Sequence, residues 1–526
     1  MNHRKTLIAA ALIASTFAST LAAHAATLTI GFADPISSTD PQLNNHAGDR
    51  SLALHFWDSI IDSLDGGKLE PALAKSWKAL DSTTWQFDLR DDVKWQDGVP
   101  FTADDILYSF QRVKNVPGSL APYTGAVRTI ESVTAKDPHT VIIKTKVPNP
   151  MLPLDIASIY IVSKHVGEKS STEDYNAGRA MIGTGPYKFI SYVPGDRTVF
   201  EVSPSYYGPK PIWDKVIYRF INNGAARTAA LLSGDVDVID KVAVTDVEKL
   251  RKTASVSVYT YPGLRVMLLQ PSLREGPNDY ITDNNGKPLA KNPLRDVRVR
   301  QALSVAINRK AIADRVLQGT VTVANQWMPK GSFGFNPDIP AIPYNVEQAK
   351  KLLAEAGYPQ GFGITIHVPG DRYPQAPETV QAVAQFWTRA GVKTKVEVVP
   401  WTVYSSRARK NEYAVSVIAW GNGTGEAGYG LLQTLATNDP ARGRGANNWG
   451  RYSNESVDKA LDAATVEFDA KRRETIFRHA AKLVTDDVGN IPLFHYQNIW
   501  AAKKGLKVVP LLSDRTTAMQ VTRVGK

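Results

Sequence analysis

Residues 89–113 read LRDDVKWQDGVPFTADDILYSFQRV and give the clearest local pattern in the chain. Apolar and polar residues alternate over residues 85–89, which predicts the end of a half-buried strand. Asp97-Gly98 predicts a tight turn, because glycine tolerates positive φ and aspartate bonds its own backbone. Thr102 with Asp105 three residues later is typical of a capping box at a helix start. The apolar stripe of that helix comprises Ile106, Phe110 and Val113.

The first residues of the chain have the composition of an export signal. Arg4 and Lys5 precede an apolar run over residues 7–21, and Ala23-His24-Ala25 fits a small-residue cleavage site. The run is short and is interrupted by serine and threonine, which argues against a transmembrane anchor. No later apolar segment approaches the ~18 residues of a membrane span. We therefore expect cleavage near Ala25 and a soluble protein in the periplasm.

The absence of cysteine decides how an exported chain of this kind is held together. It excludes disulfides, thiol nucleophiles, thiolate metal sites and the lipid-bearing cysteine of a lipoprotein. Most of the 526 residues remain after the signal, too many for one ordinary core, so two or three compact units are expected. The formal net charge is +11, but lysine and arginine are scattered. This pattern favours a basic surface and no nucleic-acid partner.

Strand and helix patterns alternate along the chain, which indicates an α/β fold. A crossover unit of strand, helix and strand is the clearest example, because it implies neighbouring strands in one sheet. Residues 183–187 hold two glycines and a proline and predict a rigid turn. The expected strands cover residues 27–32, 140–145, 199–202, 216–220, 364–368, 392–398 and 491–494, and the expected helices cover residues 51–64, 225–232, 379–390, 455–466 and 471–487.

Motifs for catalysis and cofactor binding are largely missing. The sequence has no G-x-S-x-G, H-E-x-x-H or P-loop pattern, and its nine histidines are dispersed. Residues 423–428 fit G-x-G-x-x-G after an apolar strand, but a loop follows where a dinucleotide site needs a second strand. Asp235, Asp237 and Asp240 alternate with apolar residues, which favours a strand over a Ca²⁺ loop. We expect no cofactor, no metal site and no enzymatic activity.

Aromatic residues gather between residues 401 and 449, around expected loops. Packing in a core explains roughly half of them, and the alternative is the wall of a ligand cleft, where aromatic faces bury ligand area. They are Trp401, Tyr404, Trp420, Tyr429 and Trp449.

Several segments in combination resemble family 5 of the bacterial solute-binding proteins, the peptide, dipeptide and nickel binders of ABC importers. Each segment alone is weak evidence, but their order and spacing over most of the chain are specific. The matching segments are residues 70–74 with Trp77, 89–113, 183–187, 234–237, 293–298 and 345–357, Trp420 with the glycine-rich loop after it, and residues 451–454 and 491–493.

This resemblance implies a periplasmic-binding-protein type II-like α/β fold, with two lobes joined by a hinge of two crossing segments and with an extra domain. On that template lobe I is discontinuous and comprises residues 26–58, 184–266 and 491–526. The extra domain comprises residues 59–183, and lobe II comprises residues 267–490. The implied function is capture of a peptide-like solute between the lobes and its delivery to an inner-membrane ABC permease by a monomer.

The resemblance also implies where a ligand binds. Dipeptide binders of this family hold the ligand's α-amino group with an aspartate three residues after the tryptophan that is Trp420 here, and that position is Gly423. They hold the ligand's carboxylate with an arginine, for which Arg372 is the candidate because a guanidinium fork suits a carboxylate. Glu426 replaces the missing aspartate if the loop turns back, or else is a solvated loop residue. The expected ligand-binding residues are Trp420, Asn422, Gly423, Glu426, Arg372 and Trp401.

The missing aspartate leaves the ligand class open. A peptide-like solute is the first hypothesis. A modified peptide, an opine-like amino acid conjugate, a sugar, or a metal chelate held by Arg372 and aromatic residues are the alternatives. An exported hydrolase is less favoured, because no nucleophile, base and orienting group form a set.

Overall fold

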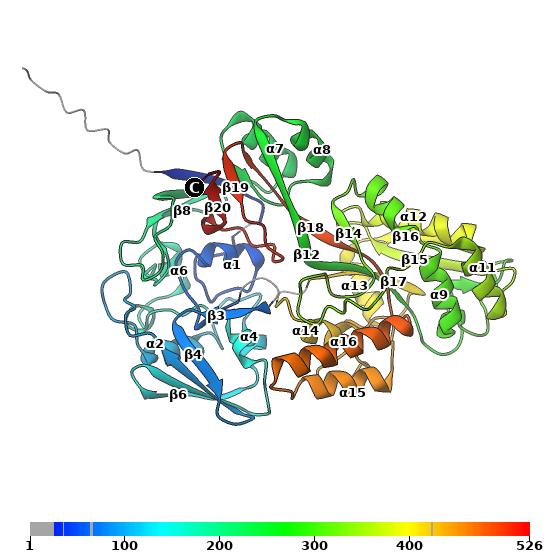
Figure 1. Cartoon of the computed structure of the whole chain (residues 1–526), viewed down its shortest axis with the longest axis horizontal. Coiled ribbons are helices and arrows are strands. Elements are labelled where there is room, and N and C mark those ends of the chain that lie inside the picture. Colours follow the sequence, from blue (N-terminus) through cyan, green and yellow to red (C-terminus); the bar gives the residue numbers. More distant parts are fainter. Residues whose placement is uncertain (1–25, 35, 64–66, 422–423, 526) are drawn as a thin grey trace, which may run out of the picture.

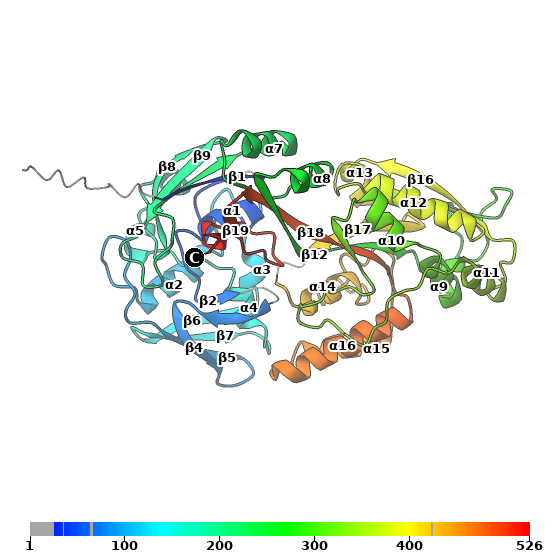
Figure 2. The same ribbon diagram turned by 45° about the horizontal axis from the view of Figure 1, so that its top comes forward.

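The computed structural model describes residues 26–34, 36–63, 67–421 and 424–525. The predicted signal peptide and the predicted ligand-binding residues Asn422 and Gly423 lie outside the described residues. The described residues form two lobes side by side, as Figures 1 and 2 show from two directions.

One mixed sheet of twelve strands within the described residues extends through both lobes. Its two long middle strands pair with each other antiparallel and run from one lobe into the other (Figure 1). Across the sheet the strands are β13 (Ile281–Thr282), β15 (Phe362–Pro369), β17 (Val415–Gly421), β12 (Val256–Pro271), β18 (Ile491–Lys503), β11 (Val238–Ile239), β1 (Thr27–Phe32), β10 (Lys215–Phe220), β9 (Arg197–Val202) and β8 (Tyr187–Val193), with β14 (Val321–Val323) on β18 and β16 (Val392–Val399) on β15.

The two long strands β12 and β18 each belong to both lobes. At one end, β11 pairs with Ala501 and Ala502 of β18, inside the first lobe. At the other end, β17 pairs with residues 265–271 of β12, inside the second lobe. The β12–β18 register shifts between Pro262 and Val266, so the ladder is interrupted between its two halves.

The first lobe contains the sheet from β11 to β8 and, beside it, a separate four-stranded sheet in the order β4, β5, β7, β6. One continuous hydrophobic cluster joins the two sheets, because Ile30 and Val216 of the first belong to it together with Phe87 and Ile143 of the second. Its other elements are α1 (Ala47–Ala53), β2 (Ile61–Ser63), β3 (Leu69–Pro71), β4 (Ala74–Ala79), β5 (Thr84–Leu89), α2 (Ala103–Arg112), α3 (Thr124–Val127), β6 (Ile130–Asp137), β7 (Thr140–Thr145), α4 (Leu152–Ile156), α5 (Lys164–Gly167), α6 (Thr172–Asn176), α7 (Gly224–Ser233), α8 (Val244–Lys252), β19 (Leu506–Val508), η4 (Ala518–Gln520) and β20 (Val521–Arg523).

The second lobe packs helices on both faces of the sheet from β13 to β17, and its two faces carry separate hydrophobic clusters. The helices α12 and α16 lie on opposite sides of this lobe (Figure 2). Its helices are η2 (Pro293–Arg295), α9 (Val297–Val305), α10 (Arg309–Ala311), η3 (Ile312–Val316), α11 (Val346–Glu355), α12 (Ala376–Arg389), α13 (Trp401–Arg409), α14 (Ala427–Thr434), α15 (Glu455–Ala464) and α16 (Ala470–Asp486).

The strand, turn and helix predicted around residues 89–113 are confirmed. Thr102 and Asp105 form the expected capping box at the start of α2, and Asp105 also accepts a hydrogen bond from the Trp95 indole at 3.2 Å. Ile106 and Phe110 are buried on the inner face of that helix.

The predicted helix over residues 51–64 is wrong. Helix α1 ends at Ala53, and the chain then crosses the core in a non-helical path to β2. Backbone bonds fix this path, because the carbonyls of Phe56 and His55 accept from the N–H groups of Gly185 and Tyr187, each at 2.9 Å. The predicted turn at residues 183–187 thus packs against backbone, and a Cβ at Gly183 would overlap the Phe56 carbonyl oxygen.

His55 is fully buried where this path meets the C-terminal segment. Its Nδ1 lies 3.1 Å from the Leu52 carbonyl oxygen, and its Nε2 accepts a hydrogen bond from the Ala518 N–H at 3.0 Å. Both contacts suit a neutral ring that donates at Nδ1. Burial lowers the pKa of His55 to about 4.

Candidate functional site

A cavity of about 710 Å³ lies where the two lobes meet along β12 and β18. Its size is within the range of small-molecule sites. Segments far apart in the sequence supply its walls. They are Asp34 after β1, residues 240–245 after β11, Arg265 of β12, Thr320, residues 372–375, residues 496–500 of β18 and Asp514.

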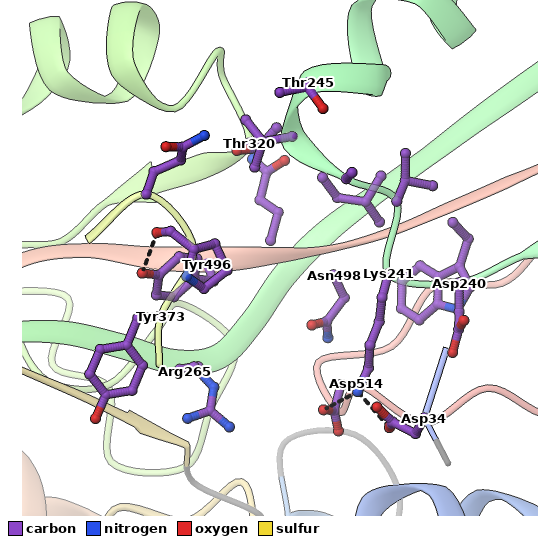
Figure 3. A pocket seen from close by; sticks show the side chains of 18 of the residues that line it. Asp34, Asp240, Lys241, Thr245, Arg265, Thr320, Tyr373, Tyr496, Asn498 and Asp514 are labelled. Atoms are coloured by element: carbon purple, nitrogen blue, oxygen red, sulfur yellow. Dashed lines mark hydrogen bonds and ion pairs between the residues drawn. The ribbon is translucent and has the colours of Figure 1, made fainter. Parts of the chain in front are cut away.

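An acidic pair joined by a lysine forms the first-lobe wall. Lys241 Nζ lies 2.6 Å from Asp34 Oδ2 and 3.4 Å from Asp514 Oδ2, and Figure 3 shows Lys241 reaching between the two carboxylates. Burial opposes the charge of Asp514, but Lys241 and Arg265 outweigh it and hold the pKa of Asp514 below its usual value. These charges favour the ionised form of Asp514 at the cavity.

Asp240, next to this cluster, behaves differently from the acidic pair. Its side chain is buried, and Oδ1 accepts a hydrogen bond from the Ala33 N–H at 2.8 Å. Burial raises the pKa of Asp240 to about 7, although Lys241 and Arg227 act in the opposite direction. Its hydrogen bond fixes the backbone just before Asp34, so its role is to position that wall.

Two exposed arginines form the wall nearer the second lobe. Arg265 donates from Nη1 to the Ala419 carbonyl at 3.0 Å, and the Arg372 guanidinium lies 5.1 Å from the centre of the Trp401 ring. Neither arginine has a carboxylate within ion-pair distance in the part of the chain that the structure describes. Guanidinium groups in this state suit the binding of an anionic ligand group.

Arg372 and Trp401, both predicted from the sequence, are brought together at the cavity. Arg372 is a lining residue, and the half-buried Trp401 beside it stacks on the buried Tyr404. Trp449 and Tyr404 are buried, so core packing is the correct interpretation for these two aromatic residues, whereas Tyr429 is exposed.

Trp420 and Glu426 do not line this cavity. Trp420, the residue before the end of β17, packs against Tyr429, with 6.2 Å between the centres of their rings. Glu426 Oε1 pairs with Arg473 Nε of α16 at 3.2 Å. The start of α14 is held against the same part of the second lobe, because the Ala427 N–H donates to the Phe333 carbonyl at 3.1 Å.

Glu426 is only 4% exposed, so the alternative of a solvated loop residue is wrong. Burial raises the pKa of Glu426 to about 7, against the opposite effect of Arg473. Whether this carboxylate contacts a ligand remains a prediction.

The rejected metal motif after α7 is a strand, as predicted. Val238 and Ile239 form β11, and Asp237 accepts from the Thr29 N–H at 2.8 Å and pairs with Lys503 at 2.7 Å. Within the described residues, no group of three or more metal-binding side chains could hold a metal ion. A search of the same residues for a helix with the length and apolar character of a membrane span found none.

Sequence reasoning missed the charged residues Asp34, Lys241, Arg265 and Asp514. They lie on four segments that are far apart in the sequence, and none belongs to a short motif. Only the pairing of β1, β11, β12 and β18 brings them together. The one sequence signal was an acidic or basic residue just after each of the apolar strands β1 and β11.

Comparisons with known proteins agree with this architecture. The family model described as "Bacterial extracellular solute-binding proteins, family 5 Middle" matches residues 68–441. The chain is 28% identical to the dipeptide-binding protein of Escherichia coli over 473 residues, which cover 84% of each chain. It is 28% identical to heme-binding protein A of Haemophilus influenzae over 451 residues, 81% of this chain and 79% of that protein.

Solved structures show the same fold. HbpA2 from Haemophilus parasuis aligns with a TM-score of 0.83 at 26% identity, over 94% of this chain and 99% of that one. The unliganded open form of the periplasmic murein tripeptide-binding protein MppA aligns with a TM-score of 0.82 at 26% identity, over 95% of this chain and 98% of that one. The match to the family model covers more than half of the sequence, and the fold is that of periplasmic binding proteins. The chain therefore belongs to the bacterial extracellular solute-binding proteins of family 5.

Proposed function

We propose that this solute-binding protein captures a zwitterionic, peptide-like solute in the cavity between its lobes and delivers it to an ABC permease. One observation carries the proposal: a single cavity has exposed guanidinium groups on one wall and the carboxylates of Asp34 and Asp514 on the other. Arg265 and Arg372 receive the ligand's carboxylate, and Asp34 with Asp514 receives its ammonium group. Charged hydrogen bonds of this kind are the strong ones.

Relatives support a peptide-like ligand. The dipeptide-binding protein of E. coli and the periplasmic murein peptide-binding protein MppA are 28% and 26% identical to this chain. The name of MppA also supports a periplasmic location, which agrees with the export signal expected from the sequence. Binding without bond chemistry, by a monomer, completes the proposal.

Capture requires that the lobes close on the ligand. We propose that lobe I comprises residues 26–58, 184–266 and 491–526, with the extra domain over 59–183 and lobe II over 267–490. The two long strands then form the hinge, and the interrupted ladder near Pro262 is where they bend. A ligand that contacts both walls favours the closed state by these additional contacts.

The likeness to solved structures supports an open state for this chain. The TM-score is 0.82 with the unliganded open form of MppA, and 0.67 at 25% identity with MoaA in complex with mannopinic acid. If this chain is open, it should align better with an open relative than with a ligand-bound one, and the two TM-scores differ in that direction.

Native mass spectrometry of the protein as isolated tests the ligand class, because tight receptors retain their solute. A peptide mass supports the proposal, whereas an opine-like conjugate, a sugar or a metal chelate would replace it. Calorimetry with L-alanyl-L-alanine, its N-acetyl form and its C-terminal amide then tests the two walls. The free dipeptide should bind at least roughly tenfold more tightly than either blocked form. Equal affinities would refute recognition of the two charges, and hydrolysis of the peptide would refute a purely binding function.

The acceptor of the ammonium group is tested by two substitutions. If Asp514 receives it, Asp514→Asn weakens dipeptide binding by ~1.5–3 kcal/mol and Glu426→Gln leaves it unchanged. The reverse result assigns the amine to Glu426, as the loop after Trp420 suggested from the sequence.

A further inference from the structure

Lys241, which lies between the two acidic side chains of the cavity, has an uncommon backbone conformation. Its φ is 44°, in the left-handed region that residues other than glycine rarely adopt. A conformation of this kind costs free energy and persists only where the surrounding structure enforces it. The place of the Lys241 side chain is therefore set by the fold around it.

A buried arginine enforces this conformation. Arg227 of α7 is 4% exposed, and it donates from Nη2 to the Lys241 carbonyl at 2.8 Å and from Nε to the Asp240 carbonyl at 3.3 Å. It also donates from Nη1 to the carbonyls of Ile221 and Asn222, at 2.7 and 2.9 Å. These bonds hold the peptide groups on both sides of the Lys241 Cα atom, and the side chain reaches into the cavity (Figure 3).

Three aspartates line the cavity, and one of them is already bonded inside the first lobe. Asp240 Oδ1 accepts from the Ala33 N–H at 2.8 Å, and its Oδ2 accepts from the Thr516 hydroxyl at 3.4 Å. Asp34 and Asp514 are therefore the two acidic lining residues that are left for a ligand.

Lys241 is shared unequally between these two carboxylates. Its Nζ lies 2.6 Å from Asp34 Oδ2 and 3.4 Å from Asp514 Oδ2. The Asp514 side chain is 46% exposed, against 24% for Asp34. An incoming ammonium group can therefore bind Asp514 while Lys241 keeps its shorter bond to Asp34.

The formal charges of this wall leave room for one cation. Two carboxylates and one lysine ammonium group leave one negative charge, which a single ligand ammonium group neutralises. A second ammonium group on the ligand would lie beside Lys241, and like charges at such short range repel each other.

We propose that Lys241 limits to one the number of ammonium groups that the acidic wall accepts from its ligand. Lys241 takes the place of a second ammonium group on Asp34, and the ligand's own group binds Asp514. Lys241 is thus a specificity-determining residue, which favours ligands with one positive charge at this end. This inference rests on the proposed function, because it takes the acidic wall as the site of the ligand's ammonium group.

Two peptides that differ by one amine test this role. L-Norvalyl-L-alanine and L-ornithyl-L-alanine share one carbon skeleton, and at about pH 6, below the pKa of both amines, the second carries one more ammonium group. Calorimetry gives the ratio of their dissociation constants in each protein. In Lys241→Met this ratio should move by about tenfold or more in favour of the ornithyl peptide, because a charged hydrogen bond replaces a like-charge contact.

Two control variants separate this role from a general effect of charge. Lys241→Arg keeps the positive charge and should keep the wild-type ratio. Lys252→Met removes the same charge from the end of α8, where Lys252 pairs with Glu248 at 2.7 Å and does not line the cavity. It should also leave the ratio unchanged.

The possible failures are distinguishable. If both peptides bind and the ratio is the same in the wild type and Lys241→Met, the role of Lys241 alone is refuted. A loss of norvalyl-peptide binding by about tenfold in Lys241→Met also refutes it, since Lys241 would then hold the ligand itself. If neither peptide binds the wild type, the proposed peptide ligand is refuted and this inference with it. Circular dichroism shows whether each variant is folded, and Lys241→Gln, which also removes the charge, replaces Lys241→Met if that variant does not fold.

Discussion

Glu426→Gln should make the protein more stable at neutral and alkaline pH, although it removes one partner of a buried ion pair. Burial raises the pKa of Glu426 from 4.5 to about 7. The folded state thus holds a proton that the unfolded state releases between these values. The free energy that this group contributes to folding is therefore fully present below pH 4.5 and is lost as the pH rises through 7.

The size of the effect follows from the pKa difference. It is about 2.5, and each pKa unit is worth about 1.4 kcal/mol, so ionisation costs the folded state about 3 kcal/mol at pH 8. Glutamine has the shape of the protonated acid and can still accept from Arg473 Nε, which now lies 3.2 Å from Oε1. We expect the variant to gain about 3 kcal/mol at pH 8 and almost nothing at about pH 4.

Urea unfolding of the wild type and variant at matched pH values measures this difference, since all other titrating groups cancel. Glu248→Gln is the control, because Glu248 forms an exposed pair with Lys252 and should change stability by less than ~0.5 kcal/mol at any pH. A variant less stable than the wild type at pH 8, or a difference that does not change with pH, would refute the reasoning.

Three further predictions concern the turn, the buried histidine and the cavity. Gly183→Ala should destabilise the protein by about 3 kcal/mol or more, because its Cβ overlaps a backbone carbonyl, whereas Gly125→Ala has open space and should be nearly neutral in thermal unfolding. Because the pKa of His55 is lowered to about 4 in the folded state, the protein should lose up to about 3 kcal/mol of stability as the pH falls from 6.5 towards 4. An unchanged pH profile of unfolding in His55→Gln would contradict this. Arg265→Gln should weaken dipeptide binding by about tenfold or more in calorimetry, and equal weakening by Arg251→Gln, an exposed arginine that does not line the cavity, would show a non-specific charge effect.

Local patterns in the sequence predicted local structure well. The capping box of Thr102 and Asp105 formed as expected, because its donors and acceptors lie within one turn of helix. The helix expected over residues 225–232 is α7, which ends at Gly234 with a φ of 88°, a conformation that favours glycine.

Local sequence patterns did not predict the parts of the fold that depend on contacts between distant segments. Residues 51–64 have helical spacing of apolar residues, yet backbone bonds to Gly185 and Tyr187 draw this segment into an irregular path. Strand β12 was missed because its first half is only partly buried and its second half is fully buried, so it neither alternates nor forms a short apolar run.

Some residues of the candidate site were predicted from the sequence, and others were not, for the same reason. Arg372 was found through the family resemblance, and Trp401 through the gathering of aromatic residues between residues 401 and 449. Lys241 and Asp514 were not, because they meet only after β11 and β18 have paired. A charge network assembled from four segments leaves no spacing that a single sequence could reveal.

The first lobe cannot finish folding until the very end of the chain is available. The bond between His55 and the Ala518 N–H closes a loop of 463 residues, and the Trp213 indole donates to the Val521 carbonyl 308 residues away. Contacts of such long sequence separation form late and slowly. Until β18 arrives, β11 and β12 keep unpaired edges, so a growing or truncated chain is exposed to proteases and to aggregation.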